Sequence, residues 1–324
     1  MRLATALLAA ALPAAPLIDA KAEAQPAGKP ITIVVPFAAG GPSDAMARLI
    51  AQGLGEVTGS RVVVENTPGA GGTIGSARVS KADPDGNTLV FGNIGTHAAN
   101  AGLYKSLPYN PETDFAPVTM VASVPFVVSV KKQLPVSDFS GFRALAEASD
   151  LNFGSAGIGS ASHLACLLLN SALGGKSKHI PYRGVAPAMN DLVGGQIDFM
   201  CDQTITMIPQ IQSDTIKPLA VMSGSRIAQL PQLPTLVEAG LPKVEVEAWN
   251  AIFAPKGTPD AVTKKLSEQI QAALQLPAIR DRLQGLGAVI ATGNAAGPEA
   301  LSHHVAQEVR KWVPIIRESG ASAD

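Results

Sequence analysis

The stretch that most constrains this chain is residues 31–57, in which an aliphatic run leads through a small-residue loop into an amphipathic segment. Residues 31–35 (ITIVV) favour a buried strand, and residues 37–42 (FAAGGP) carry little side-chain bulk. From Met46 onward, apolar side chains recur at offsets of three, four, eight and eleven residues, which places one stripe on a helix. Such a loop directs several backbone N–H groups and the positive end of the helix dipole to one point. The segment therefore predicts an anion site, with Ser43 as the cap of the helix.

The second half of the chain repeats this pattern. Residues 151–154 predict a short strand, residues 155–159 (SAGIG) a loop, and residues 160–173 a helix capped by Ser160. In open parallel sheets such loops lie at the carboxyl edge of the strands, where ligands bind. Two loops of this kind, facing each other across a cleft, would hold the two ends of one small anion. The alternative interpretation is that both are ordinary strand–helix turns.

Strand–helix alternation dominates the chain and predicts an α/β fold, with helices on both faces of mainly parallel sheets. Two long extended stretches without a helix interrupt it, at residues 115–131 and 244–254, and the first contains two prolines that divide it. We expect both stretches to cross between two domains. Residues 25–124 and 250–324 then form a discontinuous first domain, and residues 125–249 form the second. The remaining strands are expected at residues 61–65, 88–91, 178–181, 197–201 and 216–222, and the remaining helices at residues 73–81, 137–149, 186–193, 204–212, 260–274, 277–285 and 298–318.

The N-terminus predicts a secretory signal peptide over residues 1–24. Arg2 precedes a run of small apolar residues, and Ala22-Glu23-Ala24 supplies a small-x-small cleavage pattern. Two prolines within the run argue against the alternative, a buried N-terminal helix. No other stretch is apolar over a length that would cross a bilayer. We therefore expect export to the periplasm and a mature protein that begins at or near Gln25.

Charge and cysteine content argue against several classes of function. The chain carries 25 Lys and Arg against 26 Asp and Glu, a balance that does not suggest nucleic acid or an acidic membrane as a partner. The two cysteines, Cys166 and Cys201, lack the spacing of a metal site. In an oxidising compartment they can pair, whereas the alternative, which we favour, is two separately buried thiols. We expect neither a metal nor a cofactor.

Motifs for nucleotide binding and for nucleophilic catalysis are incomplete. Residues 174–177 (GGKS) resemble the end of a phosphate-binding loop, but the Gly that begins that motif is missing. Ile74 stands where a dinucleotide-binding loop needs its third Gly. Residues 153–157 (FGSAG) lack the first Gly of the nucleophile elbow. We therefore expect no catalytic residues. The alternative function is an exported serine hydrolase of α/β type, built from Ser155, Asp202 and either His303 or His304.

Several motifs in a fixed order carry a resemblance to a known family. They are residues 35–44 (VPFAAGGPSD), 65–72 (ENTPGAGG), 83–86 (DPDG), 159–164 (GSASHL), 182–184 (YRG), 194–198 (GGQID), 233–240 (LPTLVEAG) and 254–259 (APKGTP). Together they resemble the substrate-binding proteins of tripartite tricarboxylate transporter systems, the Bug or TctC-type receptors. The resemblance runs from about residue 30 to residue 318. It implies a receptor of two-domain periplasmic-binding-protein-like fold that closes on a small carboxylated metabolite and delivers it to a membrane permease. We expect this receptor to be a monomer.

The resemblance also implies which residues bind the ligand, because in this family two loops each hold one carboxylate end, largely through backbone N–H groups. The first loop carries over as Phe37, Ala38, Gly40, Gly41, Ser43 and Asp44, with Ser43 as a hydroxyl donor. The second carries over as Ser155, Gly157, Ile158, Gly159 and Ser160, with His163 one turn into the helix. Further candidates for the cleft are Thr96, Arg183 and Asp202. Asp202 would select an ammonium group or hydroxyls, or simply cap the next helix, and Phe37 would pack against ligand carbons or belong to the core. Family members vary in their ligands, so the identity of the carboxylate does not carry over.

Overall fold

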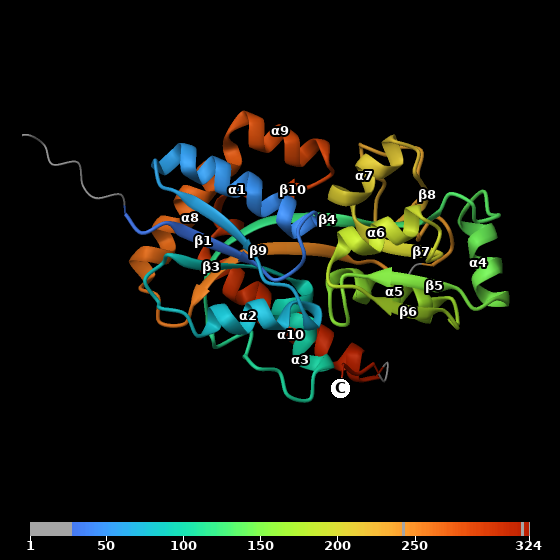
Figure 1. Ribbon diagram of the computed structural model, residues 1–324, viewed down its shortest axis with the longest axis horizontal. Helices are drawn as coiled ribbons and strands as arrows, with labels where there is room; N and C mark the ends of the chain where they lie inside the picture. Colours follow the sequence, from blue (N-terminus) through green and yellow to red (C-terminus); the bar gives the residue numbers. More distant parts are fainter. Residues whose placement is uncertain (1–27, 242–243, 319–320, 324) are drawn as a thin grey trace, which may run out of the picture.

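The computed structural model describes residues 28–241, 244–318 and 321–323. Figure 1 shows an elongated molecule whose strands follow the long axis, with helices on both sides of them. The predicted signal peptide, residues 1–24, lies outside the described residues. None of the described helices combines the length and the apolarity that a membrane span requires.

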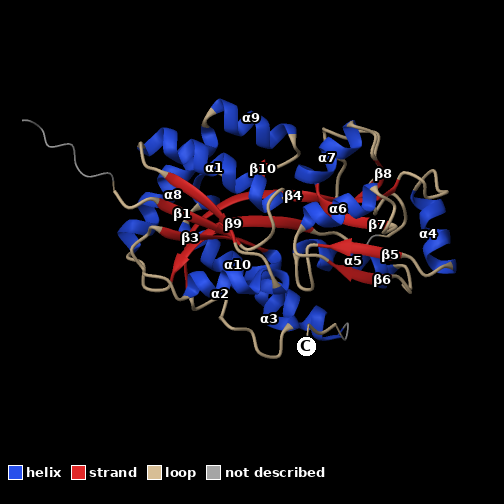
Figure 2. Cartoon of the chain, viewed as in Figure 1, coloured by secondary structure: helices blue, strands red, loops and turns tan. Residues whose placement is uncertain are grey.

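Two groups of strands build the sheet structure (Figure 2). Their order across the molecule is β2-β1-β3-β9-β4-β7-β5-β6, and β8 and β10 also pair with β4. The first sheet contains β1 (Ile31–Val35), β2 (Val62–Asn66), β3 (Thr88–Asn93), β9 (Glu247–Pro255), β10 (Val289–Ile290) and the first part of β4 (Phe115–Lys131). The second contains the last part of β4 with β5 (Asn152–Ser155), β6 (Lys178–Pro181), β7 (Phe199–Gln203) and β8 (Ile216–Val221).

Strand β4 belongs to both sheets. It pairs with β9 as far as the pair Pro125–Glu247, and with β7 from the pair Phe126–Gln203 onward. We call the first sheet with its helices lobe 1, and the second sheet with its helices lobe 2. The prediction that prolines divide this segment is wrong, because β4 continues through both, and a register shift after Pro117 accommodates the first.

The strands of the repeated strand–helix pattern run parallel to one another, whereas the two crossover strands run antiparallel to their neighbours. In lobe 1 the strands β2, β1 and β3 pair in parallel, as do β6, β5 and β7 in lobe 2. In contrast, β4 and β9 are antiparallel to each other and to their neighbours. The prediction of mainly parallel sheets therefore holds for three strands in each lobe and does not hold for the crossover strands. The reason is that β4 leaves lobe 1 while β9 returns to it, so the two must run in opposite directions.

Helices cover both faces of the sheet, and a hydrophobic core follows each face through both lobes. One face is covered by α1, α6, α7, α8 and α9, and the other by α2, α3, α4, α5 and α10 (Figure 1). Their bounds are α1 Pro42–Thr58, α2 Thr73–Ser80, α3 Asn100–Leu103, α4 Phe139–Ala148, α5 Ala161–Ala172, α6 Val185–Val193, α7 Thr204–Gln212, α8 Asp260–Gln275, α9 Pro277–Gly285 and α10 Pro298–Glu318. Short turns, η1 (Ala70–Gly72), η2 (Gly95–Ala99) and η3 (Gly293–Ala296), complete the described elements.

The two cysteines occupy neighbouring elements of lobe 2. Cys166 in α5 and Cys201 in β7 are both buried, and both are free thiols. The favoured expectation of two buried, unpaired thiols therefore holds, except that the thiols are not separate but lie beside each other. Burial, and then the neighbouring Cys166, raises the pKa of the Cys201 thiol well above its ordinary value.

Candidate ligand-binding site

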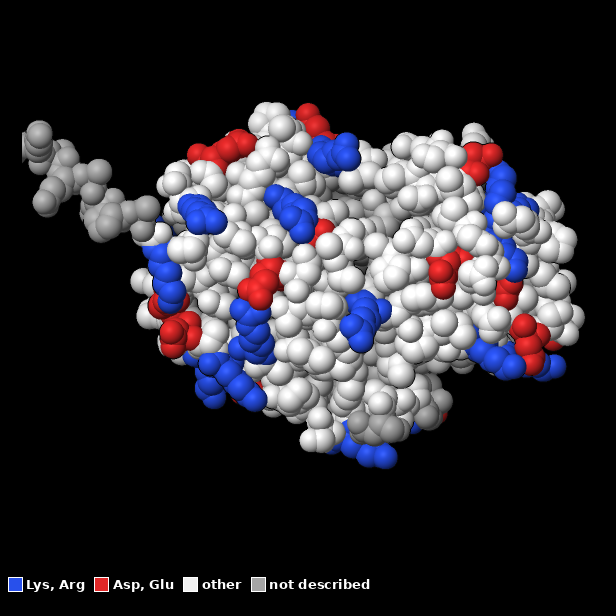
Figure 3. Space-filling view, in the orientation of Figure 1, with Lys and Arg blue, Asp and Glu red and all other residues white. Residues whose placement is uncertain are grey.

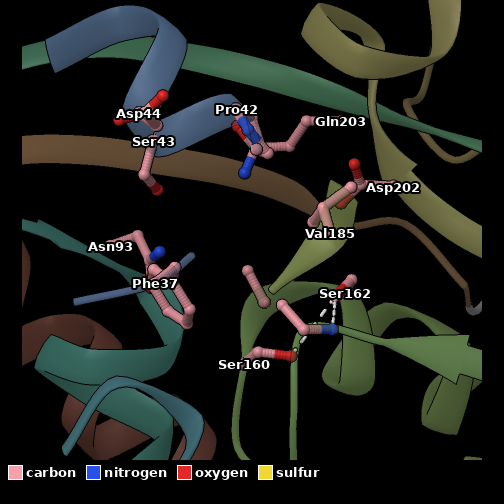
Figure 4. A pocket seen from close by; sticks show the side chains of 13 residues that line it. Phe37, Pro42, Ser43, Asp44, Asn93, Ser160, Ser162, Val185, Asp202 and Gln203 are labelled. Carbon is pink, nitrogen blue, oxygen red and sulfur yellow. Dashed lines mark hydrogen bonds between the residues drawn. The ribbon is translucent and has the colours of Figure 1, made fainter. Parts of the chain in front are cut away.

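A pocket between the lobes collects residues from both repeated loops. The space among its lining atoms, including space open to solvent, is about 320 Å³. Figure 4 shows the lining side chains of lobe 1 opposite those of lobe 2. Lobe 1 contributes Phe37, Gly41, Pro42, Ser43, Asp44 and Asn93, and lobe 2 contributes Ala156, Ser160, Ala161, Ser162, Val185, Asp202 and Gln203.

Four helices begin at this pocket. The lining includes the first three residues of α1, the cap residue Ser160 and the next two residues of α5, the first residue Val185 of α6, and the cap residue Gln203 of α7. At a helix start, backbone N–H groups have no partner within the helix and the dipole end is positive. Among the described residues, the lining contains no Lys, Arg or His. The groups that favour an anion here are therefore backbone N–H groups and helix dipoles and not basic side chains.

The first loop is held in place by Asp44. The buried Asp44 carboxylate accepts hydrogen bonds from the Gly40 backbone nitrogen at 3.0 Å, Arg48 Nε at 2.9 Å and Asn66 Nδ2 at 2.9 Å. Burial opposes ionisation, but these donors, with Arg48 first, outweigh it and lower the pKa of Asp44. Because Arg48 compensates its charge, Asp44 fixes the loop against α1 and adds little negative potential to the pocket.

The prediction that Ser43 caps α1 is wrong. The helix begins one residue earlier, at Pro42, and its cap residue is Gly41, which offers no side chain. Proline is favoured at a first helical position because its missing N–H costs nothing there. Ser43 is therefore inside the first turn, and its hydroxyl points into the pocket (Figure 4).

The second loop behaves as predicted at its helix start. Ser160 caps α5, and its Oγ accepts the His163 backbone N–H at 3.3 Å. Ser160 Oγ also lies 3.3 Å from Ser162 Oγ, which accepts the Ala156 backbone N–H at 3.0 Å (Figure 4). These bonds orient two hydroxyls at the pocket wall.

The remaining loop residues form the seam where the lobes touch. Ala38 donates its backbone N–H to the carbonyl oxygen of Arg183 at 3.1 Å. The Tyr104 hydroxyl donates to the carbonyls of Ala70 in lobe 1, at 2.8 Å, and of Ile158 in lobe 2, at 3.3 Å. A Cβ at Gly71 would collide with the Ile158 carbonyl, so only glycine permits this approach. The lobes are thus in contact around the pocket.

Several predicted site residues lie outside the pocket lining, and their ligand contacts stay a prediction. Thr96 is buried behind it and bonds to Asn93 and His97. The His163 ring stacks on His179 with centroids 4.2 Å apart, and burial, assisted by that neighbour, lowers the pKa of His163 to about 3. The side chain of Arg183 is exposed. The full set outside the lining is Ala38, Gly40, Thr96, Ser155, Gly157, Ile158, Gly159, His163 and Arg183.

The serine hydrolase alternative lacks its triad. Ser155 is fully buried, and its Oγ lies 2.6 Å from His179 Nε2. His303 and His304 line a different surface hollow, with Met120 and Lys264 in lobe 1. Neither they nor Asp202 is a hydrogen-bond partner of Ser155 among the bonds of the described residues.

Two amides in the lining escaped the sequence analysis. Asn93 Oδ1 accepts the backbone N–H groups of Gly95 at 2.9 Å and Thr96 at 3.2 Å, which leaves its Nδ2 for the pocket. Gln203 Oε1 accepts from Asn250 Nδ2 at 3.2 Å, which leaves its own Nε2. Each amide is the last residue of a strand, β3 or β7. The carboxyl-edge rule, applied to every strand and not only to the Gly-rich loops, would have found both.

Asp202 is the unusual group of the lining. It is 1% exposed, and the Thr206 hydroxyl donates to its Oδ2. Burial raises the pKa of Asp202 to about 7, although hydrogen bonds from Thr206 and the Gln203 backbone act in the opposite direction.

On the face of the molecule drawn in Figure 3, basic and acidic side chains are interspersed.

Comparison with known proteins gives consistent matches along the chain. The model of the tripartite tricarboxylate transporter family receptor matches residues 46–321. The structure of the periplasmic binding protein BugD is 42% identical, has a TM-score of 0.87, and covers 90% of this chain and 98% of BugD. MatC from Rhodopseudomonas palustris, solved with malate, is 39% identical, with a TM-score of 0.86 and coverage of 89% and 98%. A further R. palustris protein, solved with adipate, is 34% identical, with a TM-score of 0.86 and coverage of 90% and 98%.

These structures are periplasmic binding proteins of the two-domain type, so the predicted fold class is confirmed. The family resemblance carried by the sequence motifs is confirmed as well. Because the receptor model spans most of the chain and its solved relatives match over nearly all of their length, the chain belongs to the TctC family of tripartite tricarboxylate transporter receptors, the Bug proteins, which are solute-binding receptors and not enzymes.

Proposed function

We propose that this protein encloses a small carboxylated metabolite in the pocket between its lobes and delivers it to the permease subunits of a tripartite tricarboxylate-type transporter. The observation that carries the proposal is the meeting of four helix starts at a pocket whose described lining has no basic side chain. Unpaired N–H groups and positive dipole ends favour an anion there. Malate in MatC and adipate in the second R. palustris relative support a carboxylate as that anion.

We assign each part of the pocket a role in holding the ligand. One carboxylate lies at the start of α1, where Ser43 and the amide of Asn93 donate to it together with the backbone. The other end of the ligand lies at the start of α5, near the hydroxyls of Ser160 and Ser162. The Phe37 ring packs against ligand carbons, which agrees with its place in the lining.

The ligand enters and leaves by hinge closure. We propose that residues 25–124 with 250–324 move against residues 125–249, which is the motion of periplasmic binding proteins. The change of partner along β4, between Pro125 and Phe126, supports this boundary. In this proposal residues 1–24 are removed on export, and the mature receptor acts in the periplasm as a monomer.

A ligand screen on the purified chain from Gln25 tests the function. Thermal unfolding is followed with a panel of mono- and dicarboxylates. A ligand at a hundred times its dissociation constant should stabilise the protein by about 2.7 kcal/mol. Gly41→Val should abolish the shift, because the new side chain occupies the anion position beside Val185, whose Cβ would lie 3.5 Å from the new Cβ.

Arg183→Ala is the matched control for that screen. Its exposed side chain lies outside the pocket lining, so the variant should keep the ligand-induced shift. The opposite pattern, with binding lost in Arg183→Ala and retained in Gly41→Val, would replace the backbone cradle with a salt bridge. A panel in which no carboxylate shifts the wild-type protein would reject the proposed function itself.

A further inference from the structure

Asp202 is a hydrogen-bond acceptor in a pocket whose other polar groups are mostly donors. Ser43, Ser160 and Ser162 carry hydroxyls, Asn93 and Gln203 direct amide nitrogens to the site, and the helix starts offer N–H groups. All of these can donate to an anion. An ionised carboxylate, in contrast, only accepts. Asp202 can therefore accept a hydrogen bond from a donor group of whatever occupies the pocket.

Among the described residues that line the pocket, none carries a basic side chain that could compensate the charge of Asp202. The other lining carboxylate, Asp44, pairs with Arg48 at 2.9 Å. The hydrogen bonds that Asp202 receives come from the Thr206 hydroxyl and the Gln203 backbone N–H, which are both neutral. Its titratable neighbour among the described residues is the Cys201 thiol, and burial raises the pKa of Cys201, which keeps that thiol neutral. A buried charge of this kind is costly unless it is paired.

A ligand can relieve this cost in two ways. If its only charges are carboxylates, Asp202 must take up a proton, and the pocket then gains one more donor among many. If it also carries a protonated amino group, Asp202 stays ionised, and its missing counter-charge arrives with the ligand. The second arrangement satisfies the acceptor, since a hydroxyl would supply the hydrogen bond but not the charge.

We propose that the pocket selects carboxylates that also bear a protonated amino group, and that Asp202 binds this group while the helix starts bind the carboxylate. The inference rests on the proposed function and names the substrate class of the same site. In chemical terms the ligand is an amino acid or a related amino-carboxylate. Asp202 acts as a specificity-determining residue through direct contact with the ammonium group.

Calorimetric titration with matched ligand series tests the proposal on the purified chain from Gln25. Each series keeps one carbon skeleton and varies a single substituent: succinate, malate and aspartate; glutarate, 2-hydroxyglutarate and glutamate; propionate, lactate and alanine. In the series that binds, the amino member should bind at least tenfold more tightly than the hydroxy and unsubstituted members. Titration near pH 7 in two buffers of different ionisation enthalpy should show proton release on binding of the amino member.

Asp202→Asn removes the charge and keeps the shape of the side chain. This variant should lose the preference for the amino member, by tenfold or more, and retain the affinity for the unsubstituted member. Asp281→Asn, at an exposed position, is the matched control and should behave as wild type. Thermal unfolding of each variant without ligand establishes that it is folded.

The outcomes separate this inference from the proposed function. Tighter binding of succinate or malate than of aspartate, or proton uptake on binding, would leave the carboxylate receptor in place and overturn the role of Asp202. An amino preference that survives in Asp202→Asn would also overturn that role. Failure of every series to bind would instead reject the carboxylate receptor.

Discussion

The backbone nitrogen of Ala38 donates a hydrogen bond to the carbonyl oxygen of Arg183, 3.1 Å away, and so joins the first loop of lobe 1 to lobe 2 at a position two residues before α6. Together with the Tyr104 contacts, this bond holds the two lobes in contact. A variant that blocks it should therefore separate lobe closure from the chemistry of the pocket.

Gly184→Val is the variant we expect to hold the lobes apart. Its Cβ would lie 2.8 Å from the Ala38 Cβ and 3.0 Å from the Ala38 nitrogen, closer than real contacts allow. Gly184 has an extended backbone, so valine is not strained there. Small-angle scattering should show a larger radius of gyration with ligand present than for wild type, and affinity should fall about tenfold, or roughly 1.4 kcal/mol.

Gly285→Val is the control for Gly184→Val, because nothing lies within 4 Å of the position where its Cβ would be. It should leave both the radius and the affinity unchanged. Wild-type scattering and binding in Gly184→Val would argue against a closure that depends on this seam.

Ser160→Ala should affect both stability and binding. The variant loses the cap of α5 and one pocket hydroxyl, so the free energy of unfolding should fall by about 1 kcal/mol and the ligand affinity by roughly 1–2 kcal/mol. Asp138→Ala provides the comparison, since Asp138 caps α4 by accepting the Gly141 N–H at 2.8 Å, and it is not among the lining residues. Denaturant unfolding should show a similar loss for both variants, but only Ser160→Ala should weaken binding. Equal affinities would remove Ser160 from the ligand site.

Asp202→Asn should change how stability depends on pH. The pKa of Asp202 is raised from 3.8 to about 7 in the folded protein, so between these values the folded state holds a proton that the unfolded chain has released. The free energy of unfolding contributed by this group is therefore highest below pH 3.8 and falls as the pH rises toward 7, by roughly 4 kcal/mol in total. The variant should equal wild type near pH 4 and exceed it in stability at pH 8.

Buried histidines do not obscure this comparison. Burial lowers the pKa of His97 to about 3 and that of His179 to about 4, so both cost stability as the pH falls below 6.5. They are common to the two proteins and cancel in the difference. Denaturant unfolding at a series of pH values measures the difference in free energy of unfolding between wild type and Asp202→Asn. A difference that does not change with pH would contradict the raised pKa of Asp202.

Glu308 should be a strong stabilising residue of lobe 1. Its Oε2 accepts the indole N–H groups of Trp249 in β9 and Trp312 in α10, each at 3.0 Å, and both rings are nearly fully buried. Glu308→Ala leaves two buried donors without this acceptor, so we expect a loss of about 2–3 kcal/mol in the free energy of unfolding. Glu308→Gln keeps an acceptor oxygen and should lose less. Tryptophan-detected denaturation distinguishes the two, and an equal loss would assign the effect to packing.

Local sequence patterns were sufficient for the elements and insufficient for their assembly. The periodicity around Met46 and the cap at Ser160 depend on neighbouring residues, and the helices they predict are present. The antiparallel direction of β9 depends on the path of the chain between lobes, which no local pattern contains. Ser43 was misplaced because Gly41-Pro42 is a competing helix start that leaves the serine inside the first turn.

The same limit applies to the candidate site. Gly41, Ser43 and Ser160 line the pocket because each lies at a helix start, which a sequence motif can reveal. Arg183 lies in a family motif, yet it is the carbonyl of this residue that meets Ala38 while its side chain is exposed. Motif membership does not state which atoms of a residue are used. Gln203 directs its amide nitrogen to the pocket because its side-chain oxygen accepts a hydrogen bond from Asn250. Asn250 lies 47 residues further along the chain, so no local pattern contains this contact.

The return of β9 to lobe 1 also determines when this protein can fold. β3 pairs with β9, so a strand that ends at Asn93 waits for a partner that begins at Glu247. Until those later residues are available, the first sheet has an open edge and its core lacks α8 and α10. Contacts between such distant parts of a chain slow folding and leave the incomplete form prone to aggregation. The first sheet therefore stays incomplete until Glu247 and the residues after it have been synthesised, which is more than two thirds of the way along the chain.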